Sequence, residues 1–209
     1  MSFKSHPSPT AQGHPSAGGL SLFINLRVMM AAALLCALSI IFGKYLAVNI
    51  TGSIRFSLEN LPILLAGLYF GPAVGGVVGV AADLIGCMLV GYTPIPLVTV
   101  GGAAIGVCAG AMAWYIYPRR TDRFGSVRVF VPVMIAHLVG SVLIKSIGLS
   151  HFTSVPLPVT MGWRALTYLG IGAVEGTVIW LLSKNKLFMG ELTKLTRPRQ
   201  KRSKGGPRT

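Results

Sequence analysis

The sequence predicts an all-α integral membrane protein that folds as a bundle of six transmembrane helices. Of its 209 residues, 52% are hydrophobic and only 11% are charged, and the mean hydropathy is +0.66. Soluble domains usually carry roughly a quarter charged residues, so this composition indicates a chain that lies in a bilayer. At ~20 residues per crossing, the apolar part has room for about six helices. No separate soluble domain is expected.

Three regions of the chain differ in composition. Residues 1–20 are rich in Ser, Pro, Gly and His, with Lys4 as the only charge, and are expected to form a disordered leader. Residues 21–184 hold the apolar segments and are expected to form the six-helix membrane domain. Residues 185–209 are polar and basic, which predicts a solvated cytoplasmic tail that sets the topology, and contact with anionic lipid headgroups explains its charge more simply than nucleic acid does.

The first helix is expected to run from residue 22 or 26 to about residue 48. Ala33 and Ala37 lie four residues apart on it, and such a pair of small residues lets another helix approach closely. Packing within the same protein and an interface with a partner protein both fit this pattern.

The second helix, about residues 56–70, is short for a membrane crossing. It follows a polar segment that carries Arg55, contains Glu59 and Asn60, and ends on Phe-Gly-Pro. Charges at the mouth of an apolar helix are costly in lipid unless they face the interior of the bundle or a water-filled cavity. Glu59 lies one turn below Arg55, so an internal ion pair and direct ligand contact both fit. In either case this element is expected to line a small-molecule site.

The remaining helices are expected at about residues 72–90, 97–117, 129–149 and 163–182, the first two with glycines at four-residue spacing. Asp83 and Glu175 fall near the middle of their helices. They fit a pair with a shared proton, hydrogen bonds within the bundle, or contact with a ligand, and structural pairing is favoured for Glu175. His137 stands alone among apolar residues and is expected to be a hydrogen-bonded core side chain rather than a metal ligand.

The basic residues predict the orientation of the chain. Of the 19 lysines and arginines, 15 lie in the leader, at the start of the first helix, in the loop between the fourth and fifth helices, or in the tail. The positive-inside rule assigns these segments to the cytoplasm, so both termini are expected there. Topology and contact with lipid explain the net charge of +14, and no nucleic-acid partner is expected.

Four basic residues depart from this distribution and are expected in the outer leaflet: Lys44, Arg55, Lys145 and Arg164. Four cations without enough acids to neutralise them would form an anion-binding site. Arg164 follows Trp163, so a guanidinium suited to a carboxylate stands beside an indole that offers a stacking face. Anchoring at the interface is the alternative for Arg164, and snorkelling to the outer interface is the alternative for Lys145.

No motif for catalysis, metal binding or energy coupling is present in the sequence. Cys36, Cys87 and Cys108 are far apart within apolar segments, which argues against a disulfide framework or a zinc site. HExxH and GxSxG are absent, and residues 140–146 lack the glycine that a phosphate-binding loop needs before its lysine. We therefore expect no enzyme activity, metal or cofactor, and uphill transport would need an energised partner.

Residues 54–86 combine an Ile-Arg, an apolar segment with Pro-Ile and Ala-Gly, a Phe-Gly-Pro turn, and a Gly-rich helix with Ala-Asp-Leu-x-Gly. This pattern resembles the second and third helices of S components, the substrate-binding subunits of energy-coupling-factor vitamin transporters. The folate-type subgroup is the most similar. Trp163-Arg164-Ala-Leu occupies the place of that family's arginine at the start of the last helix. The resemblance covers about residues 28–183.

The resemblance implies a six-helix substrate-binding subunit in the cell membrane, with an extracellular pocket gated by the loop after the first helix. Ala33 and Ala37 would match the face that docks on a transmembrane coupling subunit, which two ATPase subunits drive. The cations would bind an anionic vitamin such as folate, and aromatic residues, including Phe56, would stack on its ring. The expected substrate-binding residues are Lys44, Arg55, Glu59, Asn60, Asp83, Tyr92, Lys145, Trp163 and Arg164.

Other interpretations stay open, because the chain departs from the family in its long basic tail and leader and in Glu59-Asn60. A different vitamin or precursor, such as a thiamine- or pyridoxine-like compound, is one, although a cationic ligand favours acids or an aromatic cage. A membrane scaffold that only packs helices through its Gly/Ala faces is another. A membrane hydrolase that uses Ser150, His151 or Asp83 is a more distant alternative.

Overall fold

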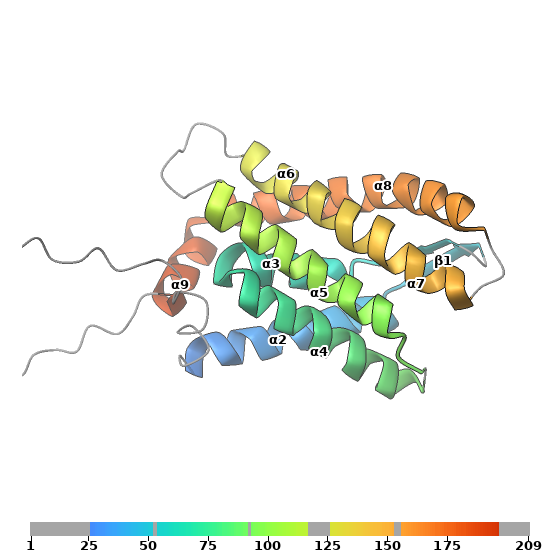
Figure 1. Cartoon of the computed structure of the whole chain (residues 1–209). Coiled ribbons are helices and arrows are strands. Elements are labelled where there is room, and N and C mark those ends of the chain that lie inside the picture. Colours follow the sequence, from blue (N-terminus) through green and yellow to red (C-terminus); the bar gives the residue numbers. More distant parts are fainter. Residues whose placement is uncertain (1–25, 52–53, 92, 117–125, 153–155, 197–209) are drawn as a thin grey trace, which may run out of the picture.

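The computed structural model describes residues 26–51, 54–91, 93–116, 126–152 and 156–196. These residues form a helical bundle with a short β-hairpin at one end (Figure 1). The expected leader and the last part of the expected tail lie outside the described ranges.

Five helices in the described ranges are long and apolar enough to cross a membrane. The predicted all-α membrane fold is thus confirmed, although the sixth apolar helix is shorter than a crossing. Two of the five long helices contain π-helical turns, η2 and η4. The five are α2 (Leu26–Lys44), α4 (Pro72–Val90), α5 (Pro96–Ala111) with η2 (Met112–Ile116), α6 (Val127–Ala136) continued by η4 (His137–Ile144) and α7 (Lys145–Phe152), and α8 (Leu157–Lys184).

The short sixth helix is α3 (Asn60–Phe70), and all eleven of its residues are buried. A helix of this length rises about 16 Å, roughly half of the hydrocarbon core of a bilayer. It packs against α2, α4 and α5 inside the bundle. Gly71, with a φ of 98°, ends α3, and Pro72 begins α4. The glycine is needed there because a positive φ disfavours residues with a Cβ atom.

A two-stranded antiparallel hairpin joins α2 to α3. It consists of β1 (Val48–Thr51) and β2 (Ile54–Phe56), with Asn49 opposite Arg55. The prediction that helices extend to residue 48 and resume at residue 56 was wrong, because β-branched residues at this point favour extended backbone. Arg55 lies on strand β2. Arg55 and Glu59 are therefore not one helical turn apart, and the helical spacing expected for an ion pair between them is absent.

Glycines allow α3, α4 and α5 to approach until their backbones touch. A Cβ atom added at Gly75 of α4 would lie 2.6 Å from Cα of Gly67 in α3 and 2.7 Å from the carbonyl oxygen of Gly106 in α5. The glycine spacing of the sequence therefore forms a packing face inside this protein.

Substitution Gly75→Ala is expected to lower the free energy of unfolding by about 1–3 kcal/mol, because the added methyl group has no space between three backbones. Thermal unfolding of the detergent-solubilised protein measures this change. Gly170→Ala on α8 is the matched control, since a Cβ atom there meets nothing within 4 Å. An equal effect of the two substitutions would contradict the assigned packing.

The two ends of the bundle differ. The hairpin lies at one end, and α9 (Lys186–Thr196), the first part of the expected tail, lies at the other (Figure 1). We call these the hairpin end and the α9 end. An apolar groove of about 550 Å³ runs between α2, α3, α8 and α9. The ring of Tyr69 in α3 packs edge-on against Phe188 of α9, and its hydroxyl lies 2.6 Å from that of Ser183.

Candidate functional site

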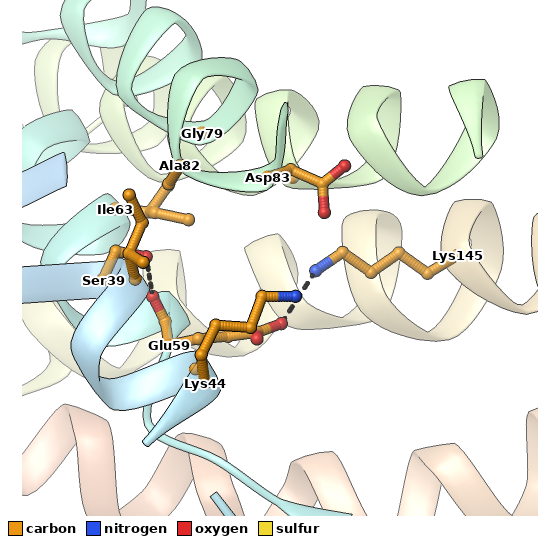
Figure 2. A pocket seen from close by; sticks show the side chains of 11 residues that line it. Ser39, Lys44, Glu59, Ile63, Gly79, Ala82, Asp83 and Lys145 are labelled. Atoms are coloured by element: carbon orange, nitrogen blue, oxygen red, sulfur yellow. Dashed lines mark hydrogen bonds and ion pairs between the residues drawn. The ribbon is translucent and has the colours of Figure 1, made fainter. Parts of the chain in front are cut away.

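A small polar cavity lies toward the hairpin end of the bundle. Its volume is about 30 Å³, which is room for one or two water molecules. Four charged side chains converge on it from α2, the segment before α3, α4 and α7 (Figure 2). The lining residues are Ser39, Ile40, Gly43, Lys44, Glu59, Ile63, Gly79, Ala82, Asp83, Gly102 and Lys145.

Lys145 reaches this cavity from the first residue of α7. Its Nζ atom lies 3.4 Å from Oε1 of Glu59, and the lysine side chain is 7% exposed, against 31% for the glutamate. Two glycines make room for the pair. A Cβ atom at Gly101 would lie 2.5 Å from Cγ of Lys145, and one at Gly43 would lie 2.8 Å from Oε2 of Glu59. The buried, paired ammonium shows that Lys145 does not snorkel to the interface.

Hydrogen bonds hold the segment that carries Glu59. The hydroxyl of Ser39 on α2 donates to the backbone carbonyl of Glu59 at 2.6 Å. The backbone N–H of Glu59 in turn donates to the hydroxyl of Ser57 at 3.2 Å. The backbone of this residue is thereby tied to α2, while its carboxylate faces the cavity (Figure 2).

Asp83 on α4 is held by α5. The hydroxyl of Thr99 donates to Oδ2 of Asp83 at 2.6 Å. Of the alternatives left open for Asp83, the structure shows a hydrogen bond from a threonine within the bundle, and it does not show a proton shared with Glu175, which pairs with His137. The stem of Lys44 lies over α4, where a Cβ atom at Gly86 would stand 3.0 Å from its Cε atom.

The charges of the cavity lining balance, with two lysines against Glu59 and Asp83. The expectation of four cations without enough acids does not hold for this cavity, since the fold brings both acids to the lysines. A site of this kind presents hydrogen-bond donors and acceptors side by side, and so suits a polar molecule that carries both.

Arg164 lies in the first half of α8, toward the hairpin end, outside the lining of the cavity. Its Nε–H donates to the backbone carbonyl of Ser141 at 3.0 Å, and Nη2 lies 3.5 Å from the hydroxyl of Tyr168. The guanidinium stands 5.3 Å from the centre of the Tyr168 ring. Tyr168 thus provides the aromatic contact of Arg164. Trp163 is 45% exposed, and its role as a stacking face for a ligand stays a prediction.

A second polar cluster joins η4 to α8 in the core. Nε2 of His137 lies 2.7 Å from Oε2 of Glu175, and the two residues are 2% and 0% exposed. Nδ1 of His137 lies 3.4 Å from the Ser141 hydroxyl, and its ring packs against that of Tyr168 at 5.3 Å. The prediction of a hydrogen-bonded core histidine is confirmed, as is structural pairing of Glu175.

Three predicted site residues remain: Asn60, Tyr92 and Arg55. Asn60 is fully buried at the start of α3, and neither polar atom of its side chain has a partner among the described residues. Tyr92 and the side chain of Arg55 lie outside the described part of the chain. Their roles in binding stay predictions.

Sequence reasoning missed several residues that shape the site. Thr99 binds the carboxylate of Asp83, Ser39 binds the backbone of Glu59, and Tyr168 contacts Arg164. Gly43 and Gly101 give space to the side chains of Glu59 and Lys145. The available signal was weak, since small and hydroxylated residues are common in packed membrane helices. Within the described residues no group of three His, Cys, Asp or Glu side chains is arranged to hold a metal ion.

These features define a multi-pass membrane protein with a polar small-molecule cavity near one end of its bundle. The sequence profile of the family "ECF transporter, substrate-specific component" matches residues 27–189. The chain therefore belongs to the substrate-specific components of ECF transporters, and the resemblance to S components is confirmed. That family consists of transporter components.

Two solved structures are similar to this chain. A crystal structure of FolT bound with folic acid superposes with a TM-score of 0.61 at 21% identity, and covers 77% of this chain and 95% of its own. The S component of a bacterial ECF transporter gives a TM-score of 0.49 at 21% identity, over 81% of this chain and 95% of its own. The first likeness shows a shared fold.

The folate transporter FolT of Clostridium novyi (strain NT) is 33% identical over 64 residues. The match covers 31% of this chain and 37% of that relative, so this chain spans little more than a third of its length.

Proposed function

We propose that this protein is the high-affinity substrate-binding subunit for uptake of folate or a related anionic heterocycle. The observation that carries the proposal is the charged cavity at the hairpin end, in a chain of this family. Buried charges inside a membrane protein are retained mainly for function. The local similarity to a folate transporter and the fold shared with FolT favour folate over other vitamins.

The cavity must enlarge when the ligand binds. Its volume is about 30 Å³, whereas pockets for ligands of this size measure roughly 300–1,000 Å³. Lys44, at the C-terminal end of α2, lines the cavity. The hairpin follows α2 in the chain and lies at the same end of the bundle (Figure 1). We assign the gate to this segment. Glu59 follows the hairpin in the chain, and its ion pair with Lys145 ties this end of the segment to α7. A polar ligand can break that ion pair.

Transport against a gradient needs partners. The sequence holds no nucleotide-binding motif, so we propose a transmembrane coupling subunit driven by two ATPase subunits. Ala33 and Ala37 on α2 are exposed and are proposed as the docking face. Leu34, 73% exposed between them, also lines the groove that reaches α9, so this surface continues into an apolar groove.

The proposed location is the cell membrane, with the hairpin end outside and both termini in the cytoplasm. The charge distribution supports this orientation, since 15 of the 19 basic residues lie in the leader, at the start of the first helix, in the loop between the fourth and fifth helices, or in the tail. We propose a role in binding rather than catalysis, with no metal or cofactor.

Identification of the bound ligand tests the proposal directly. The protein is purified in detergent, its small molecules are extracted for mass spectrometry, and folic acid is titrated into the emptied protein. One folate per chain is the expected result. A copurified thiamine- or pyridoxine-like compound, or the absence of any small-molecule binding as for a scaffold, would overturn the assignment.

Arg164→Ala is expected to weaken folate binding by roughly tenfold or more, because charge-assisted hydrogen bonds to the ligand's carboxylates contribute about 1.5–3 kcal/mol. Calorimetric titration measures the change. Arg128→Ala, in the first turn of α6 at the opposite end, is the matched control and should leave affinity unchanged. Equal affinity in Arg164→Ala and the parent protein would remove this residue from the site.

A further inference from the structure

The Lys145–Glu59 ion pair places a strong donor directly beside a strong acceptor at the cavity. The ammonium and carboxylate are 3.4 Å apart, and the lysine is almost fully buried. A single ligand group that meets both must therefore present an acceptor next to a donor. This is the arrangement of a cyclic amide, in which the carbonyl oxygen and the adjacent ring N–H point to the same side.

We propose that the Lys145–Glu59 pair opens around the lactam edge of a 2-amino-4-oxopyrimidine ring. Lys145 donates to the 4-oxo oxygen, and the Glu59 carboxylate accepts from the ring N–H and the 2-amino group. This inference rests on the proposed function and assigns the heterocycle, rather than the carboxylate tail, to the buried part of the site.

The electrostatics favour this direction of binding. A ligand carboxylate at Lys145 would stand beside the carboxylate of Glu59, and like charges at that separation repel. A neutral lactam edge instead replaces one ion pair by charge-assisted hydrogen bonds while the two charges stay close enough to attract.

The anionic tail then requires a cation without a neighbouring acid. Arg164 fits, since the groups it contacts are neutral: the Ser141 carbonyl and the Tyr168 hydroxyl and ring. Its hydrogen bond to Ser141, one turn before Lys145 in the same continuous helix, places it on the same flank of the site.

The inference makes Glu59 a specificity-determining residue. Gly43 leaves the space through which its side chain passes, and Ser39 fixes its backbone. The carboxylate is thus held at the cavity, where it rejects ligands that offer no donor.

The test compares folic acid with its 4-amino analogue, aminopterin. The analogue carries an amino donor and a bare ring nitrogen where folic acid carries the carbonyl and N–H, so both contacts become mismatched. Titrations use mildly alkaline pH, where the diaminopteridine ring is uncharged. The parent protein is expected to prefer folic acid by about 100-fold, because two buried polar groups lose their partners with the analogue.

Two variants locate the origin of that preference. Lys145→Met and Glu59→Gln are each expected to reduce it to roughly tenfold or less. Lys184→Met, the same substitution at a lysine that lies over the Trp180 ring on α8, should leave it unchanged. Thermal unfolding shows whether each variant is folded. If Lys145→Met does not fold, the preference for folic acid measured in Glu59→Gln decides the test.

The fragment p-aminobenzoyl-glutamate, which lacks the pteridine, separates the two ends of the ligand. Its affinity is expected to fall in Arg164→Ala and to persist in Lys145→Met. A loss in Lys145→Met would show that the lysine holds the carboxylates and would overturn the inference. So would an unchanged preference for folic acid in both cavity variants. If the parent protein binds neither pteridine, the proposed function itself fails.

Discussion

Glu175→Ala is expected to lower the free energy of unfolding by about 3 kcal/mol. The carboxylate is fully buried and lies 2.7 Å from Nε2 of His137, so the substitution leaves a buried imidazole without its partner and creates a cavity between η4 and α8. Denaturant or thermal unfolding in detergent, followed by a helical signal, measures the loss.

Glu175→Gln is the conservative control for this prediction, since an amide still bonds to the histidine, and it should cost about 1 kcal/mol. Replacing both partners by leucine, in His137→Leu with Glu175→Leu, removes the stranded polar group and should recover part of the stability. If the double variant were no more stable than Glu175→Ala, the pair would not be the source of the effect.

Ala33→Leu combined with Ala37→Leu is expected to reduce folate uptake by roughly tenfold to hundredfold and to leave folate affinity unchanged. Both alanines are exposed on α2, so leucine fits the isolated subunit but overpacks a helix docked against this face by ~1–3 kcal/mol. Uptake of labelled folate in cells that contain the complete transporter, alongside titration of the purified subunit, separates the two effects.

Ala173→Leu provides the matched control, because this alanine is exposed on α8, on a different helix. It should alter neither uptake nor binding. Normal uptake by the α2 double variant would place the coupling subunit on another surface, and the groove beside Leu34 and α9 would then be the next candidate.

Composition and hydrophobic length were enough to predict the helical membrane bundle and the bounds of its third helix, which the structure places at Pro72–Val90 as expected. The turn at Phe-Gly-Pro was also predictable from the sequence, because glycine is typical just after a helix end and proline is typical at the first position of the next helix. The hairpin was not predicted, because a short β-branched segment between two apolar helices resembles a continuation of either one.

The candidate site was only half predictable. Their positions in or next to apolar segments identified Lys44, Glu59, Asp83 and Lys145 as charged residues that are costly in lipid, and all four line the cavity. Which charges meet was not readable from the chain, because Lys145 and Glu59 are 86 residues apart and Asp83 is bound by Thr99 on a neighbouring helix.

The sequence by itself determined that the chain crosses a bilayer, that charges inside it must face its interior, and that its glycines bring helices together. Those properties follow from transfer energies and side-chain volume, which each residue carries wherever it lies. Only the tertiary structure decided that the cavity is charge-balanced and that His137 bonds to Glu175. Hydrogen bonds and ion pairs act over a few ångströms, so they depend on which helices the fold places side by side.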